Sequence, residues 1–177
     1  MNLSKSFTLN ELVKSQTAER EGINNNPSQT QMESLTNLCE NILQPVRDHF
    51  GKPVTVSSGF RSGELCLKVG SSLKSQHTAG QAADFEIFGI SNQDVAHWID
   101  KNLNYDQMIL EFWNPEDKNS GWVHCSYKST EENRKEFLRA YRDDNGKVCY
   151  EKYSYIKYGG EKPTKDELTD MYADKGI

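Results

Sequence analysis

The chain has 177 residues, the usual length of one domain. A mean hydropathy of −0.81 and a net charge of −5 describe a polar, acidic protein, and its aromatic residues can supply a compact core. Basic residues are interspersed with acids, so we expect no nucleic-acid partner. No segment approaches the roughly 20 apolar residues of a membrane span, and the first residues lack the apolar segment of a signal peptide. We therefore expect a protein made in the cytoplasm, without membrane insertion, and favour a monomer.

The first part of the chain predicts helices. Thr8–Glu11 has the pattern of a capping box, which opens a helix ending at about Lys14. Between Ser28 and Phe50, apolar residues recur at spacings of three and four, and this period predicts an amphipathic helix. Pro45 lies near the end of that helix, and we expect a kink there because proline has no N–H to donate.

The middle of the chain predicts a small sheet. Segments rich in β-branched and aromatic residues alternate with turns, and one amphipathic helix, Ser91–Leu103, begins at a serine cap. The Gly- and Ser-rich segment Arg61–Gln81 is expected to be irregular, and long irregular segments in compact domains tend to be functional. The predicted strands are Val54–Phe60, Ala82–Phe88, Tyr105–Trp113 and Trp122–Tyr127, of which the last two should pair antiparallel.

The C-terminal part has a less regular pattern. Thr130–Tyr141 fits a short helix or a strand, Asp143–Lys147 carries an Asn-Gly hairpin signal, and Pro163–Gly176 predicts a helix. Helices followed by strands predict the α+β class, with N-terminal helices packed on a small antiparallel sheet. We expect a domain over residues 1–142 and a C-terminal extension over residues 143–177, packed on that domain or appended to it.

Two histidines and one aspartate form a candidate metal site. His77 lies on the Gly- and Ser-rich segment seven residues before Asp84, and His124 is central in the last predicted strand. Two His and one Asp suit a zinc ion, because three protein ligands leave a fourth position for water. The same residues also fit a loop histidine, a turn-capping acid and a core histidine, so spacing alone leaves both interpretations open. His49 and His97 lie on predicted helices and fit structural roles.

Three motifs follow one another in the chain: SGxR at Ser58–Arg61, S-x-H-x6-D at Ser75–Asp84, and W-x-H at Trp122–His124. In this order they resemble the zinc D-Ala-D-Ala carboxypeptidase family, and in particular its small phage-type branch. Members of that family cut peptidoglycan stem peptides, and the family shares its fold with the Hedgehog signalling domain. The likeness covers roughly residues 7 to 127.

The resemblance implies a role for each motif residue. Arg61 would bind a substrate carboxylate or carbonyl and stabilise the oxyanion, because a guanidinium can clamp a carboxylate with two hydrogen bonds. Ser75 and Trp122 would contact the substrate. The ligands of one Zn²⁺ per chain would be His77, Asp84 and His124.

The mechanism also needs a general base that takes a proton from water. Many relatives carry a Glu three residues before the last His ligand, where this chain has Gly121. We assign the role to Glu111 on the neighbouring predicted strand, because an acid flanked by apolar residues is costly unless it faces a polar site. The other candidates are Glu86, Glu116 and Asp117.

These expectations describe a zinc peptidase acting on peptidoglycan stem peptides, either a D,D-carboxypeptidase or an L-Ala-D-Glu endopeptidase. A phage lysin that degrades the host cell wall, after release or as part of the virion, fits the sequence. Two alternatives remain open. One is a non-catalytic binding module that keeps the zinc fold, which the glycine at position 121 favours. The other is a phage structural protein whose residues 143–177 bind a partner.

Overall fold

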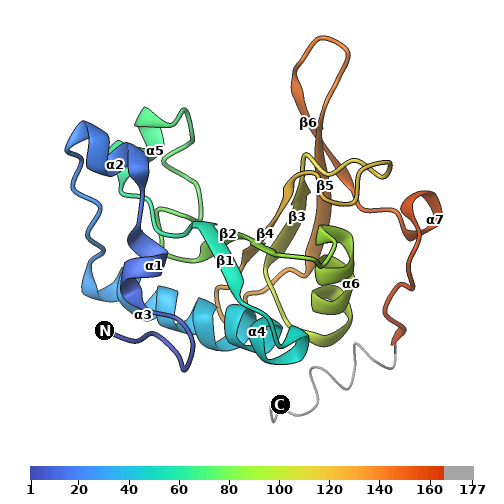
Figure 1. The fold of residues 1–177 in the computed structure, drawn as a ribbon, viewed down its shortest axis with the longest axis horizontal. Coiled ribbons are helices and arrows are strands. Elements are labelled where there is room, and N and C mark those ends of the chain that lie inside the picture. The colour runs from blue at the N-terminus through green and yellow to red at the C-terminus, as the bar shows by residue number, and fades with distance from the viewer. Residues whose placement is uncertain (166–177) are drawn as a thin grey trace.

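The computed structural model describes residues 1–165 (Figure 1). The N-terminal helical segments are α1 (Leu9–Val13), α2 (Gln16–Glu21), α3 (Gln29–Leu38), the π-helical turn η1 (Cys39–Leu43) and α4 (Gln44–Phe50). The middle of the chain holds β1 (Val54–Ser58), α5 (Gly63–Lys68), β2 (Ala82–Ile87) and α6 (Asn92–Asn102). The remaining elements are β3 (Gln107–Glu111), β4 (Trp122–Ser126), β5 (Glu136–Arg142), β6 (Val148–Lys152) and α7 (Tyr155–Tyr158).

The N-terminal helices begin where their caps predict. Thr8 and Glu11 form the expected capping box of α1, and a second capping box starts α3 at Ser28. The predicted helix from Ser28 to Phe50 is confirmed as the uninterrupted run α3, η1 and α4. The turn just before Pro45 is π-helical, which lets the helix continue although Pro45 cannot donate a backbone hydrogen bond.

The six strands form one sheet in the order β1-β2-β4-β3-β5-β6, and the α+β class is confirmed. The expected pairing of β3 with β4 is antiparallel, but the expectation of a purely antiparallel sheet is wrong, because β5 runs parallel to β3. Both edges of β4 are already occupied, so the chain leaving β4 must cross to the free edge of β3. It enters β5 where β3 begins, with Gln107 opposite Glu136, and the two strands therefore share a direction.

Three further segments were predicted from local patterns. Thr130–Tyr141 contributes the strand β5, and the Asn-Gly signal at Asp143–Lys147 is confirmed as the β5–β6 hairpin, which projects from the sheet (Figure 1). The segment Arg61–Gln81 was expected to be wholly irregular, but it contains α5, because Ser62 caps a short helix. The helix predicted at Pro163–Gly176 lies almost entirely outside the described residues.

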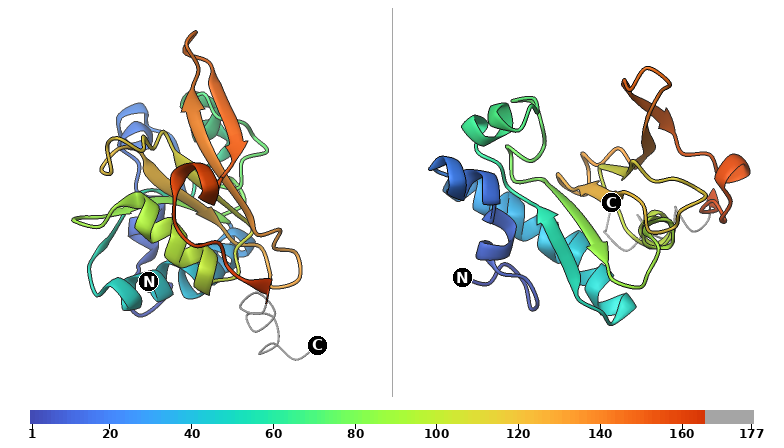
Figure 2. Two further views of the ribbon diagram at one scale, coloured as in Figure 1. Left: turned by 90° about the vertical axis from the view of Figure 1, so that its right-hand side faces the viewer. Right: turned by 45° about the horizontal axis from the view of Figure 1, so that its top comes forward.

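The two faces of the sheet differ in polarity. Inward side chains such as Phe85, Met108 and Val123 join one core with α3, α4 and α6, and these helices lie on the same side of the sheet (Figure 2). The opposite face carries Asp84 and His124 on adjacent strands. Among the described residues no helix is both long enough and apolar enough to cross a bilayer.

The segment after β6 packs back on α6. The Tyr155 hydroxyl donates to Asp100 Oδ2 at 2.6 Å, and the Gln93 amide donates to the Tyr158 carbonyl at 2.8 Å. These contacts place α7 beside α6, on the right of Figure 1. The described part of the C-terminal region is therefore held against the main body of the protein.

Gly59 of the SGxR segment lies where two backbones meet. The next residue, Phe60, donates its N–H to the Leu12 carbonyl at 2.7 Å. A Cβ at position 59 would lie 2.3 Å from that same Leu12 oxygen, which is too close for two atoms that are not bonded to each other. The glycine therefore allows the chain leaving β1 to pack against the end of α1.

We predict that Gly59→Ala lowers the free energy of unfolding by about 2–3 kcal/mol, because the added methyl group forces the two backbones apart. Gly63→Ala is the matched control, since its Cβ would meet only the flexible Leu73 side chain at 3.3 Å. Urea unfolding of the three proteins measures the difference. Equal stability of the two variants would contradict the close approach.

Candidate metal centre

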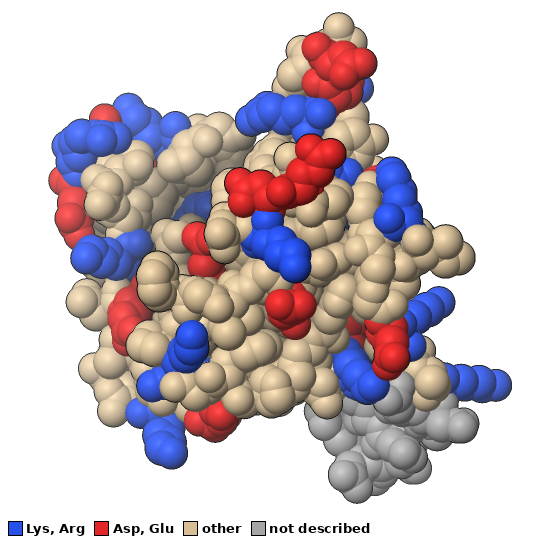
Figure 3. All heavy atoms as spheres, turned by 45° about the vertical axis from the view of Figure 1, so that its right-hand side comes forward, with Lys and Arg blue, Asp and Glu red and all other residues tan. Residues whose placement is uncertain are grey.

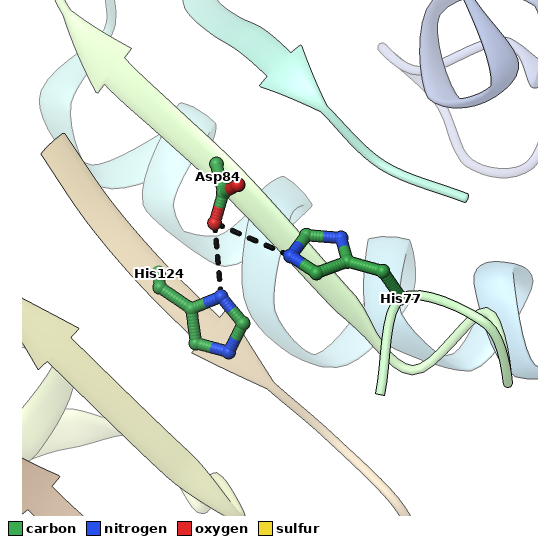
Figure 4. A group of neighbouring side chains, drawn as sticks. All are labelled: His77, Asp84 and His124. Carbon is green, nitrogen blue, oxygen red and sulfur yellow. Dashed lines mark hydrogen bonds and ion pairs between the residues drawn. The ribbon is translucent and has the colours of Figure 1, made fainter. Parts of the chain in front are cut away.

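Two histidines and an aspartate meet on the polar face of the sheet (Figure 4). Asp84 on β2 lies directly opposite His124 on β4 in the antiparallel register, so their side chains point to the same side. His77 reaches them from the loop that precedes β2. All three residues are buried, and one potential ligand atom of each lies within 4.8 Å of the other two. The structure thus brings together the three residues that the spacing singled out.

The loop that carries His77 is fixed by short-range hydrogen bonds. Ser75 Oγ accepts from the N–H of His77 at 3.3 Å, and Arg61 donates its backbone N–H to the His77 carbonyl at 3.2 Å. The loop is therefore tied both to itself and to the chain leaving β1. Ser75 was expected to contact substrate; it lines the cleft described below, and the contact that the structure shows is this bond within the loop.

The ring nitrogens of His77 have distinct partners. Nδ1 lies 2.6 Å from the Gly59 carbonyl oxygen, which can only accept, so Nδ1 carries the proton. Nε2 then presents its lone pair toward Asp84 Oδ1, 3.4 Å away. A histidine ligand whose second nitrogen donates to a carbonyl has a fixed tautomer and ring orientation.

The Asp84 carboxylate divides its two oxygens between opposite sides. Oδ1 faces the histidines and lies 2.9 Å from His124 Nδ1 (Figure 4). Oδ2 accepts a hydrogen bond of 3.0 Å from Arg61 Nη2. Arg61 Nε in turn donates to Ser58 Oγ at 2.7 Å, so the SGxR segment anchors the guanidinium behind the acid.

The protonation states suit metal binding. Burial by itself would raise the pKa of Asp84, but the close contacts with His124 and His77 outweigh it and the net pKa is lowered. Burial lowers the pKa of His77, which favours the neutral imidazole. Metal ligands must be deprotonated, and these two residues meet that condition near neutral pH. The donor set of one carboxylate and two imidazoles therefore fits a zinc ion.

Arg61 was expected to bind substrate, and its first partner in the structure is Asp84. The guanidinium is mostly buried, and its Nη1 group makes no hydrogen bond to any residue in the described part of the chain. The side chain lines the cleft, so this remaining donor group stays available. Asp84 thus holds the Arg61 guanidinium in place, while its Nη1 group has no partner among the described residues.

Glu111 is a half-buried carboxylate at the end of β3. It lies opposite Trp122, two residues along β3 from the residue opposite His124, and therefore points to the same face of the sheet. It forms no hydrogen bond or ion pair with the residues that the structure describes. Burial raises the pKa of Glu111, against the opposing attraction of His124 and Arg61.

Gly121 explains why the general base of many relatives is missing here. The residue has φ of +65°, and a Cβ would lie 2.0 Å from the backbone oxygen of Glu111. No side chain fits at this position of the β3–β4 connection. The alternative acids Glu86, Glu116 and Asp117 are exposed and do not line the cleft, in contrast to Glu111.

The metal-ligand candidates lie in a cleft of about 830 Å³. Figure 3 shows a hollow beside the projecting β5–β6 hairpin, with Lys and Arg side chains on its rim. Trp122 forms part of the wall, and its buried indole N–H has no hydrogen-bond partner among the described residues. No local pattern marks three further residues that line the cleft: Lys128, Arg134 and Tyr150. Lys128 follows β4, and the placement of β5 and β6 brings Arg134 and Tyr150 here.

A second buried acid, Asp106, fastens the His77 loop to the sheet. Its carboxylate accepts from Arg134 Nε at 2.9 Å and Nη2 at 2.8 Å, and from the Gln76 amide at 2.8 Å. Gln76 directly precedes His77, so these bonds connect the loop to the starts of β3 and β5. Burial would raise the pKa of Asp106, but the bonds from Arg134 and Gln76 lower it overall.

Comparison with known families agrees with this geometry. A family model described as Peptidase M15 matches residues 5–126, which is more than half of the chain. The chain therefore belongs to the peptidase M15 family, whose members are zinc-dependent peptidases that act on peptidoglycan-type peptides. Comparison with curated proteins returned no match.

We predict that purified protein binds one zinc ion, and that His77→Ala and His124→Ala each abolish this binding, because two remaining ligands cannot hold the ion. His49→Ala is the matched control, since that exposed ring stacks on Trp98, on α6. Elemental analysis after dialysis measures the metal content. Undiminished zinc in either of the first two variants would exclude the assigned ligand set.

We predict that Asp106→Asn lowers the free energy of unfolding at pH 7 by about 2–3 kcal/mol, because Arg134 loses its charged partner. Since the folded-state pKa of Asp106 is lowered, its contribution is present above the unfolded value of about 3.9 and is lost as pH falls through the folded value. The difference between variant and wild type should therefore shrink in acid. Asp144→Asn, in the exposed hairpin turn, is the control for urea unfolding at each pH.

Proposed function

We propose that this protein is a zinc peptidase that hydrolyses an amide bond in the stem peptides of peptidoglycan, as a D,D-carboxypeptidase or an endopeptidase. One observation carries the proposal: an unpaired, half-buried carboxylate, Glu111, shares a cleft with the buried His–Asp–His group. A carboxylate without a partner costs stability, so its position calls for a functional explanation. Membership of the peptidase M15 family supports the reaction class.

Each residue of the cleft has a chemical task in this proposal. A zinc ion held by His77, Asp84 and His124 supplies a Lewis acid with one position left for water. Glu111 accepts a proton from the attacking water and passes it to the amine that leaves. Its raised pKa brings the carboxylate closer to the working pH, which favours proton transfer in both directions.

Two further residues are suited to hold the substrate. Arg61 directs its unused Nη1 group to a substrate carboxylate or to the oxyanion, while its bond to Asp84 fixes the guanidinium. The Trp122 indole N–H donates to a peptide carbonyl, which satisfies an otherwise unpaired buried donor. Arg61 and Trp122 would thus hold the substrate beside the residues that carry out the reaction.

The proposal extends to the biological setting of a phage lysin that degrades the host cell wall. The support is the substrate class of the family. The released products identify the bond: free D-Ala indicates a carboxypeptidase, and cleaved stem peptides indicate an endopeptidase. Clearing of permeabilised bacterial cells by the zinc-loaded protein tests the lytic role.

We predict that Glu111→Gln lowers kcat by about 10²- to 10⁴-fold, because the amide is isosteric but cannot accept the proton. Zinc content should stay at the wild-type level, since Glu111 does not belong to the ligand group. Glu116→Gln, in the exposed β3–β4 turn, is the matched control and should keep full activity. Product release from purified peptidoglycan, with and without a chelator, measures the reaction.

A zinc-loaded wild-type protein that releases no product from any stem peptide would overturn the enzyme proposal and leave the non-catalytic binding module. Full activity of Glu111→Gln would overturn only the assignment of Glu111 as the general base, and would leave the peptidase itself in place.

A further inference from the structure

The cleft has a basic end that the proposed reaction does not use. Lys128 follows β4, Arg134 precedes β5, and both line the same cleft as His124. Both residues lie beyond the segment 5–126 that the family model matches. Resting on the proposed function, we propose that Lys128 and Arg134 form a second subsite, which binds a carboxylate of the peptide substrate close to the scissile bond.

The register of the strands places this subsite relative to the metal group. Ile109 lies opposite His124, and Gln107 lies two residues before Ile109 at the start of β3, where Asp106 binds Arg134. Two residues of a strand span about 7 Å. Glu111 lies two residues from Ile109 in the other direction. The basic end and the candidate base therefore flank the metal group from opposite sides, at the spacing of one or two peptide residues.

Arg134 is already oriented for an anion. Asp106 holds its Nε and Nη2 groups in a two-bond contact, while Nη1 has no hydrogen-bond partner in the described part of the chain. A guanidinium fixed in this way loses little conformational entropy when its free edge binds a ligand. Lys128 lies beside it, with Nζ 3.9 Å from Asp106 Oδ2 and the backbone N–H bound to Asn133 Oδ1 at 2.9 Å.

The charge of the cleft opposes the charge of the protein. The whole chain has a net charge of −5, but the described residues that line the cleft include four basic ones, Arg61, Lys74, Lys128 and Arg134, and two acids, Asp84 and Glu111. Asp84 is bound by Arg61, and Glu111 lies at the other end. Asp106, beside the basic end, offsets one of the two charges of Lys128 and Arg134, so this end keeps an excess of positive charge. Because low-dielectric walls concentrate the field of such groups, the basic end attracts an anion.

A carboxylate of the stem peptide is the ligand that fits these donors. Stem peptides carry a free carboxylate on the D-Glu residue and another at the C-terminus, and each can be replaced by an uncharged carboxamide of nearly the same shape. Arg134 Nη1 and Lys128 Nζ offer two charged donors to the two oxygens of a carboxylate. A carboxamide presents only one oxygen and no charge, so the subsite should discriminate between the two forms.

The test uses the pentapeptide L-Ala-γ-D-Glu-L-Lys-D-Ala-D-Ala in two matched pairs. One pair has a carboxylate or a carboxamide on D-Glu, and the other has a carboxylate or a carboxamide at the C-terminus. Calorimetry measures Kd on zinc-loaded Glu111→Gln protein, so that binding is separated from cleavage, and kcat/KM is measured with protein that keeps Glu111. In one of the two pairs we expect the carboxylate peptide to bind roughly five- to tenfold more tightly than the carboxamide peptide. This difference is typical of one or two partly exposed charged contacts.

Lys128→Gln should remove most of this preference without changing the fold, because the Lys128 ammonium makes one long contact, 3.9 Å to Asp106, within the part of the chain that the structure describes. Arg134→Lys keeps the charge opposite Asp106 but loses the fork, and should also weaken the preference. Lys118→Gln, in the exposed β3–β4 turn, is the matched control and should keep it. Raising the salt concentration should reduce the preference in wild type more than in Lys128→Gln.

The outcomes separate this inference from the proposed function. A preference that Lys128→Gln abolishes supports the subsite even if no peptide is cleaved. If both wild type and Lys128→Gln cleave peptides, and both prefer the carboxylate form to the same extent, the subsite is overturned and the proposed peptidase function is retained. The absence of any preference in both pairs also overturns the subsite.

Discussion

The burial of one carboxylate organises this protein. Asp84 lies on β2, between β1 and β4, and a buried charge is stable only with partners close by. Its two oxygens bind in opposite directions, one to the histidines and the other to Arg61. The β2–β4 register, the SGxR segment and the His77 loop each bring one of its partners to this group. The same arrangement produces three converging donor atoms, so the needs of folding and of metal binding coincide here.

Three acids on or beside the cleft differ in whether they have ion-pair partners, and this difference distinguishes structural acids from the candidate catalytic one. Asp84 and Asp106 are buried, hydrogen-bonded and charge-paired, and both have a lowered pKa. Glu111 is half-buried, has no ion-pair partner among residues 1–165, and its pKa is raised. The paired acids stabilise the framework around the cleft. Glu111 lowers the stability of the framework, and this cost is one reason why we propose that it transfers a proton in the reaction.

The position of the candidate base shows how a turn constrains chemistry. At Gly121 the chain passes so close to the backbone of β3 that a side chain is excluded. An acid carried by the preceding turn, as in many relatives, would need a different β3–β4 connection. Glu111 points into the cleft from the strand itself, which is more rigid than a turn. In our proposal, Glu111 on the neighbouring strand takes the role of the acid that the motif lacks in this chain.

Local sequence patterns determined much of this protein. The capped helices α1, α3 and α6, four strands and the β5–β6 hairpin depend on neighbouring residues, and they form where the sequence predicts them. The ordered motifs that contain His77, Asp84 and His124 also indicated a single site. The parallel β5, the lack of a partner for Glu111 and the basic end of the cleft were decided only by tertiary structure. Each depends on residues far apart in the chain, because strand order, burial and charge pairing are set by which segments pack together and not by the residues beside them.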